Sequence, residues 1–257
     1  MKHTHFFAIA FLFLLSACIT TTSNTGLPTS VVLPNIGQKF FESIEISGKQ
    51  FPLPEGNFEV AGTDLSITGK NGYATSIFLV NHRNGHIQRA VEIYTNLSIK
   101  RSDGPSALGW ATHRSCIRDD MHFRETIKNE RLGYQDCWWV NHWRMIRTGN
   151  RQTEHWKETI DFLKKNQLSA PLEMIAVSYR IANKTDYATI NYFFNPVSAG
   201  FPAVIDDKWE TGTWSDSPWR PDNVKKNSAR SKYINSLISW GKSWHKQITH
   251  ILTKTRP

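Results

Sequence analysis

Two pairs of apolar segments along the chain have the pattern of β-hairpins. Residues 73–80 form a dense apolar run, Asn84-Gly85 supplies the residues of a tight turn, and apolar residues alternate over 87–97. The second pair, 173–182 and 187–194, alternates on both sides of a short polar turn. The pattern therefore predicts two antiparallel hairpins.

Two shorter alternations predict further strands. In residues 38–47, Phe40, Ile44 and Ile46 share one parity, and in residues 137–146 two tryptophans fall on one face. A proline-containing break at residues 52–56 interrupts the chain between two of these strands, because each proline fixes a bend.

Helical periodicity appears twice. In residues 153–166, Trp156, Ile160 and Leu163 recur at steps of four and three. Residues 221–253 carry a longer apolar stripe with the same spacing. We therefore expect an α+β fold with one antiparallel sheet, flat or curled into a partial barrel, a short middle helix and a long C-terminal amphipathic helix.

The charge balance is basic and is uneven along the chain. There are 31 Lys and Arg against 22 Asp and Glu, which gives a net charge of +9. After Asp222 no acidic residue occurs, and the predicted C-terminal helix begins with the basic residues Lys225, Lys226, Arg230 and Lys232. Such a helix either lies on an anionic surface or packs on the sheet with its lysines in solvent.

The N-terminus has the organisation of an export signal. Lys2 precedes an apolar run over residues 6–15, which is too short to span a bilayer and has the length of a signal-peptide core. The segment Leu15-Ser16-Ala17-Cys18 then resembles the lipobox of bacterial lipoproteins. This resemblance implies that residues 1–17 are removed and that Cys18 is acylated. The simpler alternative is a secretory signal followed by a cysteine of no special role.

The lipoprotein resemblance also implies a location. Lipoproteins of Gram-negative bacteria that lack aspartate after the modified cysteine pass to the outer membrane, and Ile19 stands at that position. The uncharged segment up to residue 33 has the composition of a flexible tether, so residues 18–33 would join the lipid to a single domain over 34–257. In a Gram-negative cell, the resemblance implies a protein anchored in the outer membrane with its domain facing the periplasm.

Two cysteines remain in the predicted domain. Outside the cytoplasm, Cys116 and Cys137 are expected to form a disulfide, and the alternative is a reactive thiol with a neighbouring histidine. No Cys-x-x-Cys pair favours metal binding at either cysteine.

Known catalytic and cofactor motifs are absent from the sequence. It contains neither a His-Glu-x-x-His zinc motif nor a Gly-x-Ser-x-Gly nucleophile elbow nor a Walker phosphate loop, so we predict no metal and no cofactor. Histidines and aspartates near the cysteines would form an acid/base cluster only if strand alternation did not scatter them. They are His113, His122, His142, His155, Asp119, Asp120 and Asp136. His82 and His86 flank the first hairpin turn, where loop histidines are more common than ligands.

A tryptophan-rich segment lies before the C-terminal helix. Trp209, Trp214 and Trp219 recur at steps of five among several carboxylates. Such a loop either grips a sugar between indole rings and carboxylates or is pinned to the sheet by its own tryptophans.

The sequence therefore predicts a lipid-anchored cell-envelope protein that binds an anionic envelope component, either lipid or cell-wall polymer. We expect no nucleic-acid partner for an exported protein of this kind. The alternatives are an enzyme that acts on cell-wall glycan and a structural subunit of an envelope assembly. Nothing in the motifs argues positively for catalysis.

Overall fold

The strands and helices of the domain begin after residue 38. The computed structural model describes residues 32–68, 72–97, 114–130, 134–145, 153–204 and 217–252. The predicted signal peptide, Cys18 and the tether as far as residue 31 lie outside the described residues, as do Trp209 and Trp214.

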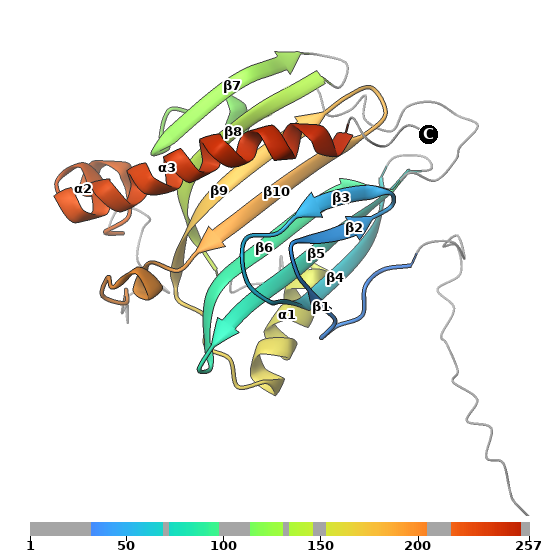
Figure 1. Ribbon diagram of the computed structural model, residues 1–257, viewed down its shortest axis with the longest axis horizontal. Coiled ribbons are helices and arrows are strands. Elements are labelled where there is room, and N and C mark those ends of the chain that lie inside the picture. Colours follow the sequence, from blue (N-terminus) through green and yellow to red (C-terminus); the bar gives the residue numbers. More distant parts are fainter. Residues whose placement is uncertain are drawn as a thin grey trace, which may run out of the picture. The chain divides into compact units, whose positions relative to one another are not determined.

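An open antiparallel sheet of eight strands is the centre of the fold (Figure 1). Its order is β1-β4-β5-β6-β10-β9-β8-β7, and every neighbouring pair is antiparallel. The strands are β1 (Lys39–Phe40), β4 (Phe58–Thr68), β5 (Gly72–Arg83), β6 (His86–Asn96), β7 (Phe123–Glu130), β8 (Tyr134–Arg144), β9 (Glu173–Ala182) and β10 (Tyr187–Phe194). The predicted α+β class is confirmed, and the sheet does not close into a barrel.

The sheet consists of two halves that are also separate in sequence. Strands β1, β4, β5 and β6 come from the first part of the chain, and β7 to β10 come from the second. The β6–β10 ladder joins the halves, from the pair Arg89–Phe194 to the pair Thr95–Ala188. Each half is otherwise built mainly from strands that are neighbours along the chain.

Both predicted hairpins are confirmed. Strands β5 and β6 turn at Asn84 and Gly85, which have φ angles of 52° and 76°. Positive φ at both central residues is what a type I′ turn requires, and Asn-Gly adopts it at low cost. Strands β9 and β10 pair from Ala182–Tyr187 to Ile175–Phe194.

The prediction of one strand over residues 38–47 is wrong. Glu42 has a φ angle of 57° and turns the chain between β1 and β2 (Ser43–Ile46). Strand β2 then pairs with β3 (Lys49–Pro52) in a separate two-stranded sheet. The shared parity of the apolar residues therefore reflected two short strands that belong to different sheets.

A buried lysine holds this small sheet in place. Lys49 is 0 % exposed, and its Nζ donates to the backbone oxygen of Asn96 at 2.6 Å and lies 3.1 Å from Oδ1 of Asp186. Tyr192 on β10 donates from its hydroxyl to the backbone oxygen of Pro52. These bonds tie the small hairpin to the ends of β6 and β10.

Helix α1 (Glu154–Lys165) covers one face of the first half of the sheet. Gly62 on β4 allows this close approach, because a Cβ there would lie 2.0 Å from the backbone oxygen of His155. Phe162 of the helix packs with Phe78 and Val80 of β5 in one buried cluster. The predicted middle helix is confirmed.

Helix α3 (Ser228–Thr249) covers the opposite face. Gly241 approaches Trp138 and Val177 closely, and its backbone oxygen accepts a hydrogen bond from Tyr179. The single helix predicted over residues 221–253 is interrupted: α2 (Pro221–Lys225) ends at a turn, and Asn227 caps α3 by accepting from the amide of Arg230. A short 3-10 turn, η5 (His250–Leu252), follows.

The predicted disulfide between Cys116 and Cys137 is present. It joins the 3-10 turn η2 (Arg114–Cys116) to β8, and both cysteines are fully buried. Arg124 and Thr126 of β7 donate to the backbone oxygen of Cys116. The bond therefore fixes the segment before β7 against the edge of the sheet.

Candidate functional site

Helices α2 and α3 carry a row of exposed lysines, which we call the basic face. All of its members are exposed, and they are Lys225, Lys226, Lys232, Lys242 and Lys246. Three of the four basic residues that the sequence singled out, all except Arg230, belong to this face.

The periodicity of α3 explains why these lysines face solvent. Ile234, Leu237 and Ile248 are buried against the sheet. At 100° per residue, Lys232 and Lys246 lie on the opposite side of the helix. They are roughly 21 Å apart along its axis, so the face is an extended row of charges and not a single point.

Few carboxylates neutralise the basic face. Asp222 lies 3.9 Å from Lys225, and no acidic residue follows it in the sequence. Within the described ranges, Lys232, Lys242 and Lys246 form no ion pair. The other exposed positions of α3 carry Ser, Asn, Gln and Ala, so the surface is polar and positive.

Arg230 and Trp219 anchor the N-terminal end of α3. The guanidinium of Arg230 lies 5.6 Å from the centre of the Trp219 indole, and its Nη1 donates to the backbone oxygen of Pro218. Trp219 is 2 % exposed and packs against Phe201 and Tyr233. This tryptophan pins its loop to the domain, and its indole is not free to stack on a ligand at the surface.

Two histidines meet beneath the turn that leads into α2. The rings of His122 and His142 are 6.0 Å apart and meet edge to face. Burial lowers the pKa of His122 to about 4 and that of His142 to about 3, and the charges of Lys225 and Arg220 act in the same direction. Both imidazoles are therefore neutral at neutral pH and add no charge to the basic face.

The other candidate acid/base residues go to separate partners. Asp119 pairs with Arg124, and Asp120 pairs with Arg118. Asp136 on β8 accepts from His245 on α3 at 2.6 Å. Asp120 also acts on His142 through its charge. His113 lies outside the described residues.

His155 belongs to a polar link that the sequence did not indicate. Its Nε2 lies 3.0 Å from Oε1 of Glu92, and Asn191 donates to the other oxygen of that carboxyl group. The link joins α1 to β6 and β10. Its members are far apart in sequence, and no local pattern signals their contact.

The hairpin histidines also have separate partners. His82 lies 3.6 Å from Glu59, and His86 bonds to Ser169. In the described part of the chain, no group of three or more His, Cys, Asp or Glu side chains is arranged to hold a metal ion. Both cysteines of the domain are consumed by the disulfide, which removes the reactive-thiol alternative.

No helix among the described residues is long and apolar enough to cross a membrane. Comparisons with protein-family models, with curated proteins and with solved structures found no match.

Proposed function

We propose that this protein is a binding module for an anionic component of the bacterial cell envelope. In this proposal, lipid on Cys18 holds the protein in the envelope, and the basic face of α2 and α3 makes the contact. The observation that carries the proposal is the row of exposed lysines on α3 without carboxylate partners.

The expected strength of the contact follows from the number of lysines. Each lysine near an anionic surface contributes about 1 kcal/mol, and salt weakens this attraction. The five lysines together therefore give a weak but usable attraction. A lipid anchor would raise the effective concentration of the surface, so high intrinsic affinity is not required.

The polar surroundings of the lysines indicate how the contact is made. Exposed positions between them include Ser236, Ser239 and Ser243, and no large apolar side chain of α3 is exposed. A helix that inserts into a bilayer needs an outward apolar face. We therefore expect binding to charged groups at the surface without insertion.

Vesicle binding tests the basic face. The test uses a form lacking residues 1–18, which retains every described element, mixed with anionic and neutral vesicles and with isolated cell-wall polymer at low and high salt. Wild-type protein should bind anionic material at low salt only. The triple change Lys232→Gln, Lys242→Gln and Lys246→Gln should strongly weaken this binding, because it removes three of the five lysines.

A matched triple variant controls for net charge. Lys157, Lys164 and Lys165 lie on α1, and all three side chains are exposed. Changing these to Gln removes the same charge from another face and should leave binding almost unchanged. Equal loss in both triple variants, or no binding by wild type at low salt, would show that the basic face only keeps the protein soluble.

The anchor is tested separately. Full-length protein should partition into detergent after export, whereas a Cys18→Ala variant should remain soluble or uncleaved. Identical aqueous partitioning of the two forms would refute the lipid anchor and leave the basic face to be judged by the vesicle assay alone.

A further inference from the structure

The exposed side chains of α3 all fall on one side of the helix. At 100° per residue they lie within an arc of about 140°, which is centred opposite the buried Gly241. None of them is acidic, and none is a large apolar side chain. They are Ser228, Ala229, Lys232, Asn235, Ser236, Ser239, Lys242, Ser243, Lys246 and Gln247. The exposed side of α3 is therefore positive and polar along its whole length.

The lysines on this side stand above a smooth surface. The hydroxyls of Ser236, Ser239 and Ser243 donate to backbone oxygens three or four residues earlier in the same helix, so these short side chains turn toward it. The long lysine side chains project beyond them. Because the three lysines lie within about 80° of one another around the axis, a flat surface meets all of them together.

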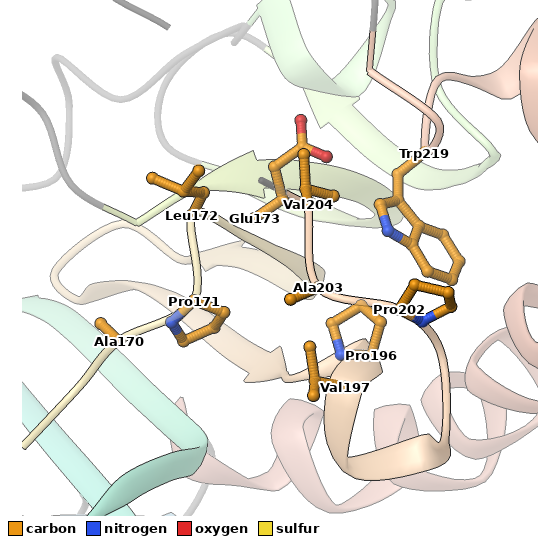
Figure 2. A pocket seen from close by; sticks show the side chains of 10 residues that line it. All are labelled: Ala170, Pro171, Leu172, Glu173, Pro196, Val197, Pro202, Ala203, Val204 and Trp219. Atoms are coloured by element: carbon orange, nitrogen blue, oxygen red, sulfur yellow. The ribbon is translucent and has the colours of Figure 1, made fainter. Parts of the chain in front are cut away.

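Contacts at both ends fix α3 relative to the sheet. Near its C-terminal end, Nε2 of His245 lies 2.6 Å from Oδ1 of Asp136 on β8. Before its N-terminal end, Trp219 lines a small pocket with Pro202 (Figure 2), and Arg230 of α3 lies over the indole. Proline fixes its own backbone angle φ, and the indole is buried. Any surface that orients α3 therefore orients the whole domain.

The shape of this side of α3 favours a flat partner over a polymer chain. The outer side of a helix is convex, so it meets a plane along its length. A flexible polymer touches it only at separate charges and loses conformational freedom when it is held there. A plane is also close at hand in the proposed function, because the chain between Cys18 and Val32 spans at most about 50 Å when extended.

We propose that the basic face docks on the surface of an anionic lipid bilayer with the axis of α3 parallel to the membrane plane. This inference rests on the proposed function and names its partner. Lys232, Lys242 and Lys246 reach lipid phosphates together, without insertion of the helix. The sheet lies behind α3, and α1, on the opposite face of the sheet, lies away from the membrane (Figure 1).

Site-directed spin labels test this orientation. The form lacking residues 1–18 contains the Cys116–Cys137 disulfide and no other cysteine, so a single introduced cysteine is labelled selectively. Labels at Ser228→Cys and Ser243→Cys are roughly 22 Å apart along α3. Asp161→Cys places a label on the exposed side of α1.

The labelled proteins are bound to vesicles of phosphatidylglycerol and phosphatidylcholine. A small fraction of the lipid carries a gadolinium chelate, which speeds the relaxation of nitroxides that lie close to the bilayer surface. Relaxation of the two α3 labels should become faster to the same extent, because a helix parallel to the membrane holds both at one height. Relaxation of the α1 label should not change.

A charge variant tests the lipid partner at the centre of the exposed side. Ser239→Glu should weaken binding to these vesicles about fivefold relative to Ser239→Gln, because it places one carboxylate against anionic phosphates. Ser239→Gln has the same size without the charge and should bind like wild type. Equal binding of the two variants would overturn the docking surface.

The remaining outcomes separate this inference from the proposed function. Vesicle binding with unequal relaxation of the two α3 labels, or with faster relaxation of the α1 label, overturns the parallel orientation and leaves the proposed function intact. Binding to isolated cell-wall polymer but not to vesicles overturns the lipid partner alone. Binding to neither material overturns both proposals.

Discussion

Replacing Gly241 by alanine tests how α3 is seated on the sheet. Gly241 is buried, and its backbone oxygen accepts a hydrogen bond of 2.7 Å from the hydroxyl of Tyr179. An added Cβ would lie 2.5 Å from Cζ3 of Trp138 and 2.9 Å from Cγ1 of Val177. These separations are too short for van der Waals contact, so either the helix or the two side chains must move.

Two effects of opposite sign determine the change in stability. Alanine in a helix interior is favoured over glycine by about 1 kcal/mol. Overpacking a buried contact costs about 1–3 kcal/mol. Trp138 is fully buried, and its Nε1 donates to Glu125 at 2.8 Å, so the indole cannot turn away freely. We therefore place the packing cost at the upper end and expect a net loss of about 2 kcal/mol.

Urea unfolding measures this difference directly. Gly241→Ala should lower the midpoint with little change in the slope, because the unfolded state exposes the same surface. Ser243→Ala, at an exposed position two residues along the helix, isolates the gain in helix propensity and should be neutral or slightly stabilising. If Gly241→Ala is as stable as wild type or more stable, the result would refute the close packing of α3 against Trp138.

Three further predictions concern the interior of the domain. The unfolded chain takes up a proton on His142 below pH 6.5, whereas the folded protein, with a pKa of about 3, does not. The free energy of unfolding should therefore fall as the pH is lowered from 6.5 to 4.5. In urea unfolding, His142→Gln should make this fall smaller by about 2–3 kcal/mol. An equal fall in both proteins would contradict the buried, neutral imidazole. Lys49→Met should lower the free energy of unfolding by about 3 kcal/mol, because it removes the buried cation that pairs with Asp186. An unchanged thermal unfolding midpoint would refute this role of Lys49. Changing Cys116 and Cys137 to serine together should cost about 3 kcal/mol. In wild type, mass spectrometry should find the two peptides linked, and free alkylation of both thiols in native protein would disprove the bond.

Local patterns were sufficient to predict the hairpins, the middle helix and the disulfide. Asn84-Gly85 specifies its turn through backbone conformation alone, and α1 has an uninterrupted apolar stripe. Strand β7 was missed because almost all of its residues are exposed, so no alternation marks it. Strand β4 was missed because Gly, Thr, Asp and Ser interrupt its apolar residues.

The candidate sites show the same division. The basic face follows from charge and helical periodicity, which are both local properties. The polar link of His155, Glu92 and Asn191 joins residues from separate parts of the sequence, which meet only through the order of the strands.

The joint between the two halves of the sheet has a consequence for how the protein folds. Pairing Thr95 with Ala188 closes a loop of about 90 residues, whereas the hairpin contacts within each half are local. Contacts between residues that are distant in sequence form slowly. We therefore expect the strands within each half to pair first and the β6–β10 ladder to form last. Until then β6 and β10 present bare edges to other chains. The step at which this protein is most prone to aggregate is therefore the final one, when each half is already formed and still unpaired.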